Sequence, residues 1–262
     1  MPMKQSQGVS MPKLIFLGTA SAIPDPQHEN THFAITLEDR ILMVDSASNP
    51  VVRLEQAGLN HELLTDLIVT HFHPDHVSGV PSLLMSTWLM GRKKAINIYG
   101  LEYTLERLKR MMVDYDWETW PKFYPVHFNA VSNQEYALVM EDEELRVLAS
   151  PVHHLVPTIG LRMEFTANKK VLAYSCDTEP CQEVVRLAKG ADVLIHEATG
   201  ATLGHTSAEQ AGDIARQAGV GKLYLIHYPV GGFDARSLIP EAAKTFNGPI
   251  YIAEDFMEVP LD

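Results

Sequence analysis

The densest group of chemically active side chains runs from His71 to His76, with three histidines and an aspartate in six residues. Residues 66–70 before it have the apolar pattern of a short buried strand, so the group lies where a strand ends and a loop begins. Histidines at i and i+2 can direct their imidazoles at one point, while Asp75 and His76 turn toward a neighbouring one. Nitrogen donors with a single carboxylate suit zinc or a similar metal better than calcium or magnesium. The alternative is a solvated histidine-rich loop. A random order of the same residues would produce the pattern His-x-His-x-Asp-His only rarely.

Other residues of metal-ligand type stand at the ends of further predicted strands. They are the pair His153 and His154 after residues 145–149, Asp177 after 171–176, and His227 after 223–226. Strand ends at one edge of a layered sheet are where a rigid scaffold brings distant side chains together. Each residue alone is compatible with a core histidine or a turn aspartate. Together with the first group they predict one converging site.

Strand and helix patterns alternate along the chain, which predicts a layered α/β fold with helices outside the sheets. We expect strands at 14–17, 33–37, 41–44, 66–70, 96–99, 145–149, 159–165, 171–174, 193–196, 223–226 and 250–253. We expect helices at 51–57, 76–90, 101–113, 179–188, 207–218 and 240–246. No repeat or low-complexity linker interrupts the pattern. We therefore expect a flexible N-terminal extension over residues 1–10 and a single domain over residues 11–262.

Composition limits the classes of protein that the chain can represent. Its 262 residues are 46% hydrophobic and 21% charged, with a formal net charge of −12, which disfavours broad nonspecific binding to nucleic acid. No apolar run reaches about 18 residues, so we expect no membrane span. The first ten residues are polar and do not resemble a secretory signal. The two cysteines, Cys176 and Cys181, cannot form a disulfide framework, so we expect a cytoplasmic location.

The ordered set His-x-His-x-Asp-His, then histidine, aspartate and histidine, resembles the metallo-β-lactamase superfamily. Shorter segments narrow the resemblance to its ribonuclease Z-like branch, and the match extends from about residue 14 to the C-terminus. These segments are residues 17–24, 154–160, 175–178, 196–199, 204–207 and 252–257. The resemblance implies an α/β fold, the four-layer αββα sandwich, with the metal site at one edge of the sheets. The third of the family's motifs makes His154, rather than His153, the ligand.

By this resemblance, seven side chains would bind two divalent metal ions. One ion would be held by His71, His73 and His154, the other by Asp75, His76 and His227, and both by Asp177 as a bridge. Zinc is the expected metal, with manganese or iron as alternatives. Two adjacent cations can deprotonate a shared water near neutral pH and clamp the attacking and leaving oxygens of a phosphodiester. Asp75 could also steer the proton of the nucleophile.

Three further residues have expected roles beside the metals. Asp45 resembles the buried aspartate that orients the metal loop in this superfamily; the alternative is a solvated turn aspartate. His205 precedes residues 206–210, whose pattern fits a helix capping box, and could stabilise developing charge or protonate a leaving oxygen. The alternative is a histidine that only packs at a helix start. Glu197 could relay a proton to His205 or serve as a structural hydrogen-bond partner.

Two features depart from the ribonuclease Z pattern. That enzyme carries a long arm that grips tRNA, commonly between the third-motif histidine and the bridging aspartate, but here two predicted strands fill the interval. The turn at residues 45–50 also lacks the branch's usual acidic, glycine-containing sequence.

A basic segment, residues 92–110, is interpreted as a solvated helix face rather than a nucleic-acid contact. An aromatic segment, residues 115–124, could be a substrate-side wall, a dimer contact or core.

The sequence therefore predicts a metal-dependent hydrolase of the ribonuclease Z-like branch, a phosphodiesterase acting on a small phosphodiester or another ester. We expect a homodimer with no membrane association, and RNA is a less favoured substrate. The first alternative is a tRNA 3′-processing endonuclease without the usual arm. Further alternatives are a hydrolase of thioesters, lactams or sulfate esters, because the metal ligands alone do not decide the bond cleaved, and a noncatalytic metal-binding protein.

Overall fold

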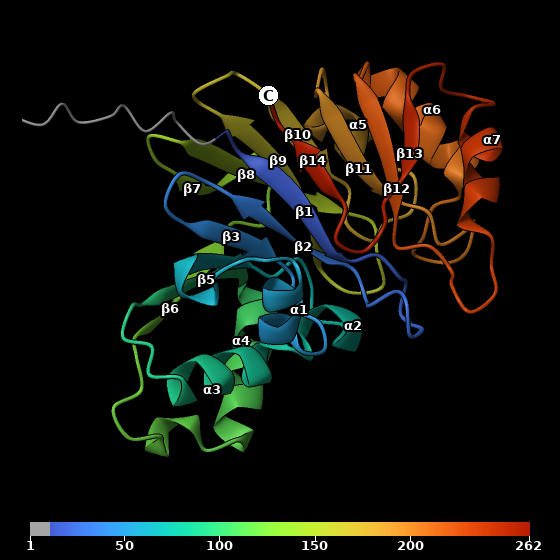
Figure 1. Cartoon of the computed structure of the whole chain (residues 1–262). Helices are drawn as coiled ribbons and strands as arrows, with labels where there is room; N and C mark the ends of the chain where they lie inside the picture. Colours follow the sequence, from blue (N-terminus) through green and yellow to red (C-terminus); the bar gives the residue numbers. More distant parts are fainter. Residues whose placement is uncertain (1–10) are drawn as a thin grey trace, which may run out of the picture.

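The computed structural model describes residues 11–262, and within that range the strands form two seven-stranded sheets packed face to face (Figure 1). The first sheet contains, in spatial order, β14 (Glu258–Pro260), β1 (Lys13–Gly18), β2 (His32–Thr36), β3 (Ile41–Val44), β4 (Leu64–Ile68), β5 (Ile96–Leu101) and β6 (Val126–Val131). The second contains β13 (Ile250–Ile252), β12 (Lys222–Ile226), β11 (Val193–Glu197), β10 (Val171–Tyr174), β9 (Thr158–Phe165), β8 (Leu145–Val152) and β7 (Ala137–Glu141). The extension predicted over residues 1–10 lies outside the described residues.

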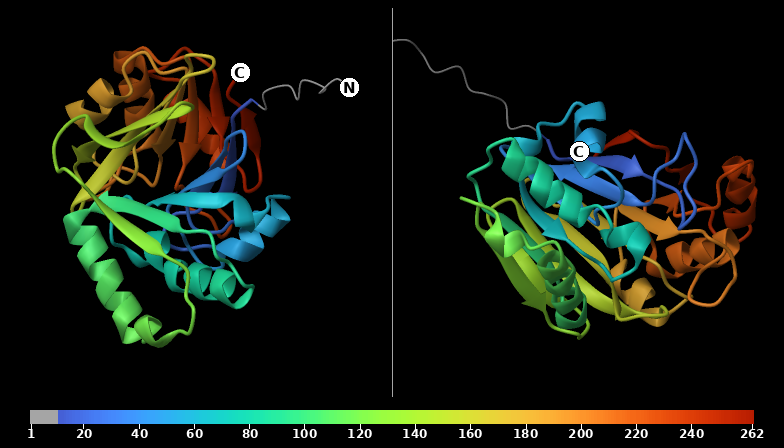
Figure 2. Two further views of the ribbon diagram at one scale, coloured as in Figure 1. Left: turned by 90° about the vertical axis from the view of Figure 1, so that its left-hand side faces the viewer. Right: turned by 90° about the horizontal axis from the view of Figure 1, so that it is seen from below.

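Helices cover the outer face of each sheet (Figure 2). The helices of the first half of the chain are α1 (Pro50–Gln56), α2 (Pro74–Val77), α3 (Val80–Leu89) and α4 (Glu102–Asp114). Those of the second half are α5 (Gln182–Leu187), α6 (Ala208–Ala218) and α7 (Leu238–Ala242). The described residues also form the short 3₁₀ turns η1 (His61–Leu63), η2 (Trp117–Thr119) and η3 (Ala235–Ser237). The predicted α/β sandwich with helices outside two sheets is confirmed.

Three apolar layers hold these elements together. Between the sheets, Phe33 packs edge-on against Tyr174 with ring centroids 5.1 Å apart, and both side chains are fully buried. One outer layer packs Leu54, Leu84 and Leu108 of α1, α3 and α4 against the first sheet, and the other packs α5, α6 and α7 against the second. Burial of apolar surface on both faces explains why most strands are continuous hydrophobic runs rather than alternating ones.

Parallel pairing brings the carboxyl ends of distant strands to the same edge of each sheet. The strands β3, β4, β5 and β6 are parallel neighbours, as are β10, β11, β12 and β13. The residues that follow β3, β4, β10 and β12 include Asp45, His71, Asp177 and His227. The topology therefore places the predicted ligands around one end of the sandwich.

The helix predicted over residues 76–90 is wrong in one respect, because the chain forms two helices, α2 and α3, separated near Gly79. The Gly79 N–H donates to the Ser46 carbonyl at 2.8 Å, and a Cβ at this glycine would lie 2.7 Å from the Ala47 backbone. This contact holds the segment that carries the predicted ligands His71 to His76 against the residues after β3. The strands β6, β7 and β14 were not predicted, and none of the helices described in residues 11–262 is long and apolar enough to cross a membrane.

Candidate metal centre

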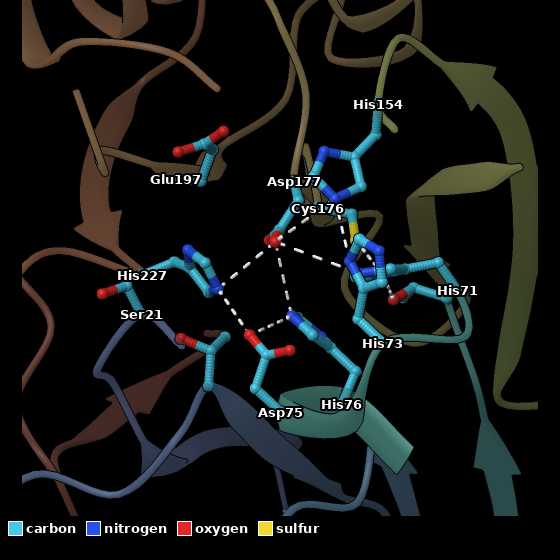
Figure 3. A network of polar contacts seen from close by, with 12 residues as sticks. Ser21, His71, His73, Asp75, His76, His154, Cys176, Asp177, Glu197 and His227 are labelled. Carbon is cyan, nitrogen blue, oxygen red and sulfur yellow. Dashed lines mark hydrogen bonds and ion pairs between the residues drawn. The ribbon is translucent and has the colours of Figure 1, made fainter. Parts of the chain in front are cut away.

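Three of the predicted ligands form one group (Figure 3). The His73 Nδ1 atom lies 3.1 Å from His71 Nε2 and 3.1 Å from His154 Nε2. Burial lowers the pKa of all three imidazoles, which favours neutral rings that each keep one nitrogen free to bind a metal. Three neutral imidazoles that converge on one point are an arrangement that could hold a cation.

The other predicted ligands form a second group beside the first. The Asp75 Oδ2 atom lies 3.4 Å from both His76 Nε2 and His227 Nε2. The His76 ring is fully buried and the His227 ring nearly so, while Asp75 is partly exposed at the first turn of α2. This group has two nitrogens and one carboxylate, which again suits a borderline divalent metal.

Asp177 lies between the two groups, at the centre of Figure 3. Its Oδ2 atom is 3.4 Å from His76 Nε2 and 3.3 Å from His227 Nε2. The same oxygen is 4.0 Å from both His71 Nε2 and His154 Nε2 in the first group. A single carboxylate oxygen facing nitrogens of both groups has the position of a ligand shared by two ions.

Unpaired buried atoms at the centre of the site also fit a bound metal. Among the described residues, His76 Nε2 and Asp177 Oδ1 are buried side-chain atoms without a hydrogen-bond partner. Buried polar atoms without partners are rare in folded proteins, because each loses its hydrogen bonds to water. A cation bound there would give these atoms the partner that the protein does not supply.

Three of the imidazoles are oriented through the ring nitrogen that faces away from the centre. His76 Nδ1 lies 2.8 Å from Asp45 Oδ2, and His154 Nδ1 lies 2.8 Å from the Gly204 carbonyl. His227 Nδ1 lies 2.9 Å from the Thr199 hydroxyl. Such contacts select the tautomer and fix the ring plane of a metal-binding histidine. Neither Thr199 nor the Gly204 carbonyl was predicted from the sequence to orient a ligand, although both belong to segments that carried the family resemblance.

Asp45 is buried and does not lie in a solvated turn. Its carboxylate accepts hydrogen bonds from the Thr70 N–H at 2.8 Å and from the Thr70 hydroxyl at 2.8 Å. Because Thr70 immediately precedes His71, Asp45 connects β3 to both ends of the histidine run. The expectation that this aspartate is buried and contacts the metal loop is confirmed.

The backbone turns sharply where three strands reach the centre. Asp45, Cys176 and His227 have φ angles of 59°, 55° and 54°, in the left-handed region that non-glycine residues rarely adopt. Each such residue costs about 1–3 kcal/mol and persists only where the surrounding structure imposes it. The turns redirect the chain at the ends of β3, β10 and β12, so that Asp177 and His227 reach the centre.

The comparison with known proteins agrees with this geometry. The sequence profile of the Beta-lactamase superfamily domain matches residues 47–228, which include every predicted metal ligand. The chain belongs to the metallo-β-lactamase superfamily. It aligns with ribonuclease Z of Methanothermobacter thermautotrophicus at 26% identity over 309 positions, which cover 95% of this chain and 96% of that protein. It is a metal-dependent hydrolase of the ribonuclease Z-like branch of the superfamily.

Solved structures show the same fold. The metallo-β-lactamase fold protein YhfI from Bacillus subtilis superposes with a TM-score of 0.81 at 21% identity, over 95% of this chain and 99% of that chain. The human tRNase Z, short form, superposes with a TM-score of 0.77 at 22% identity, with the same two coverages. These similarities confirm the metallo-β-lactamase fold.

Beside the metallo-β-lactamase centre, His205 and Glu197 form a pair. His205 Nδ1 lies 3.0 Å from Glu197 Oε1, and the Glu197 carboxylate is fully buried. Burial disfavours the charged ring, but the hydrogen bond and negative charge of Glu197 outweigh this effect and raise the pKa of His205. The predicted helix start is also present, because Ser207 caps α6 in a capping box with Gln210.

Other predicted features have structural roles in this metallo-β-lactamase fold. Arg92 is buried and donates hydrogen bonds to the backbone carbonyls of Leu64, Lys94 and Ala95, so it does not belong to an exposed basic strip. The aromatic segment packs partly against α3, where Trp88 and Trp120 stack with ring centroids 4.9 Å apart. It therefore contributes to the outer helical layer while keeping exposed edges.

Proposed function

We propose that this protein is a two-metal phosphodiesterase whose substrate is smaller than tRNA. The observation that supports it most directly is the position of Asp177 Oδ2, which faces the nitrogens of both groups at 3.3 to 4.0 Å. One carboxylate shared by two three-residue groups is the arrangement expected for a pair of cations rather than for one.

The proposed ligands divide into three sets, as predicted from the sequence. His71, His73 and His154 would bind one ion, Asp75, His76 and His227 the other, and Asp177 both. Zinc is proposed because the donors are mainly imidazole nitrogens, with manganese or iron as alternatives. A bound pair would polarise a water and offset negative charge on the phosphoryl oxygens.

We propose that His205 protonates the leaving oxygen of the substrate. Its ring is partly exposed and lies near the centre, with its centroid 5.1 Å from the ring of His154 and 5.8 Å from that of His227. Glu197 holds the Nδ1 edge of the ring, so Nε2 is the atom left to carry a proton toward a substrate. In this proposal Glu197 is a positioning residue, and Asp75 steers the proton of the attacking water.

The chain's length and charge support a small substrate. Between His154 and Asp177 the chain forms only β9 and β10 with a short turn, so the described residues have no arm in this interval. The alignment with the archaeal ribonuclease Z spans 309 positions, more than the 262 residues of this chain, so that relative has residues with no counterpart here. A net charge of −12 also opposes extended contact with a polyanion.

The second candidate function is tRNA 3′ processing. It is favoured by the similarity to ribonuclease Z, which covers nearly the whole length of both proteins. Because Arg92 is buried, an RNA contact on the basic segment would depend on the exposed Lys93 and Lys94 and on the charged face of α4.

A panel of substrates tests the proposal. We expect turnover of bis(p-nitrophenyl) phosphate with zinc or manganese, and much lower kcat/KM for precursor tRNA, a lactam and a thioester. Phosphate contacts make RNA affinity fall steeply with salt, whereas a small diester at the metal centre should show a shallow dependence. Efficient cleavage at the 3′ side of the discriminator base would establish the second candidate instead. In that case Lys93→Glu with Lys94→Glu should raise KM for precursor tRNA and leave KM for the small diester unchanged.

We also propose a cytoplasmic homodimer. The exposed face of α3 and the residue after it carry Met85, Leu89 and Met90, whose exposed fractions are 42%, 67% and 48%. Adjacent exposed apolar side chains favour association between copies of a chain. Sedimentation of the wild type and of Leu89→Asp tests this proposal, which predicts a dimer for the first and a monomer for the second.

A further inference from the structure

A second set of metal-binding side chains lies outside the candidate metal centre. His153 Nδ1 or Nε2, Cys181 Sγ and a carboxylate oxygen of Glu183 all lie within 4.8 Å of one another. His153 follows β8, Cys181 immediately precedes α5, and Glu183 lies in the first turn of that helix. The ligand atoms of the first histidine group of the metal centre also lie within 4.8 Å of one another.

We infer that His153, Cys181 and Glu183 form a third metal site, which binds zinc or a similar divalent cation that accepts thiolate. A donor set of nitrogen, sulfur and one carboxylate excludes the all-oxygen coordination that calcium and magnesium prefer. Three protein ligands leave one position of a tetrahedral zinc ion for water. Neither the family resemblance nor the proposed reaction uses these three residues.

The carboxylate of Glu183 is held in a suitable orientation. Its Oε1 atom accepts a hydrogen bond from Arg186 Nη2 at 2.7 Å, which leaves Oε2 facing His153 Nε2 at 3.5 Å. Ligand atoms of a tetrahedral zinc site lie about 3.4 Å apart, given metal–ligand bonds of about 2.0–2.3 Å. This pair therefore already has the separation that a shared ion requires.

The sulfur of Cys181 lies beside two polar groups. The Thr178 hydroxyl is 3.6 Å from Sγ, and the backbone N–H of Val184 also faces the sulfur. Burial raises the pKa of the Cys181 thiol, so a cation must displace its proton when it binds. The side chain of His153 is 61% exposed, which gives an ion a path from solvent.

The third site adjoins two segments of the metal centre. His153 precedes the proposed ligand His154, and its N–H donates to the Thr178 hydroxyl at 3.0 Å. Thr178 in turn follows the proposed bridge Asp177. An ion bound to His153 and Cys181 would therefore join the loop after β8 to the loop after β10, which carry these two ligands.

Titration of the metal-free full-length protein with cobalt(II) tests the inference, because cobalt bound to thiolate gives a charge-transfer absorption that imidazole and carboxylate ligands do not. We expect this absorption to keep growing as cobalt(II) is added after the two centre sites are already filled. It should disappear in Cys181→Ala and persist in Cys176→Ala, which removes the only other cysteine of the chain. Zinc-loaded wild type should retain three equivalents after gel filtration, and Cys181→Ala one equivalent fewer.

A second variant keeps the test decisive if Cys181→Ala folds poorly. His153→Ala changes an exposed side chain, so it should fold normally and still lose the thiolate absorption and one zinc equivalent. The inference is overturned if wild type shows no thiolate absorption, or if the absorption persists in either variant. It is also overturned if the absorption is lost in Cys176→Ala alone, which would assign the thiolate to the centre.

Discussion

Glu197→Gln tests whether the buried carboxylate sets the charge of His205, because the substitution removes the charge and replaces one acceptor oxygen with an NH2 donor while hardly changing the shape. Glu197 Oε1 accepts hydrogen bonds from the N–H groups of Thr178 and Thr206, both at 3.1 Å, and lies 3.0 Å from His205 Nδ1. Glu197 Oε2 accepts the Thr199 N–H at 3.0 Å. All four partners are donors, so the amide nitrogen of glutamine must face one of them.

The lower-cost orientation turns the amide nitrogen toward Thr199 and loses a single hydrogen bond. An unpaired donor in a buried site costs about 1–3 kcal/mol. The other three bonds weaken without the negative charge, but this loss is offset because a neutral amide is cheaper to bury than a carboxylate. We therefore expect the free energy of unfolding to fall by about 1–3 kcal/mol. Glu197→Ala would leave four donors unpaired, a loss comparable with the whole stability of about 5–15 kcal/mol, so glutamine is the informative change.

The same substitution should change the pH dependence of the reaction in a definite direction. The charge of Glu197 raises the pKa of His205, so the ring keeps its proton to a higher pH. Without that charge the proton leaves at a lower pH, and the alkaline limb of the kcat/KM profile should move to lower pH. Urea unfolding of the metal-free protein measures the stability, and turnover of bis(p-nitrophenyl) phosphate across the pH range measures the limb.

Asp213→Asn is a matched control, because it neutralises a half-exposed carboxylate of α6 that contacts Arg216 and Gln217 rather than His205. It should leave the alkaline limb unchanged and alter the free energy of unfolding by less than about 0.5 kcal/mol. If Glu197→Gln left both the stability and the alkaline limb at their wild-type values, the proposed role of Glu197 would be refuted. A loss of stability with an unshifted limb would assign Glu197 a purely structural role.

Four further substitutions test the geometry of the centre. Asp177→Ala should reduce metal content, measured by elemental analysis, by more than one equivalent, because the carboxylate faces both groups; loss of one or none contradicts a bridge. Gly79→Ala should lower the free energy of unfolding by about 1–3 kcal/mol, measured in urea, because the new Cβ meets the Ala47 backbone at 2.7 Å. His154→Ala should abolish diester turnover and weaken metal retention at the centre, whereas His153→Ala should keep both. Reversed effects would show that His153, not His154, is the ligand of the third motif.

The proposed ligands could be singled out in the sequence because their signals are local. His71, Asp177 and His227 each follow a short apolar run, and a strand that ends at a polar residue leaves that residue at the edge of a sheet. The helix and strand pattern also predicted the layers, since amphipathic helices must cover the outer faces of sheets. The choice of His154 over His153 came from resemblance, and the structure brings His154 to His73 while His153 faces Glu183.

Other features depend on contacts between distant residues, which a local pattern does not contain. The break between α2 and α3 follows from the approach of Gly79 to the residues after β3, since the apolar spacing continues through it. Arg92 looked like part of a charged surface because Lys93 and Lys94 follow it in the sequence. One of the carbonyl groups that it binds belongs to Leu64 of β4, which is distant in the sequence. The Thr199 hydroxyl at His227 likewise depends on how β11 and β12 pair.

The strained backbone and the unpaired atoms of the centre have one physical explanation. The left-handed turns at Asp45, Cys176 and His227 and the unpaired atoms of His76 and Asp177 all oppose folding of the metal-free chain. They persist because the two sheets bury enough apolar surface to impose the conformation. Cations that bind only the folded chain would recover part of this cost, since ligand binding stabilises the state that holds the site.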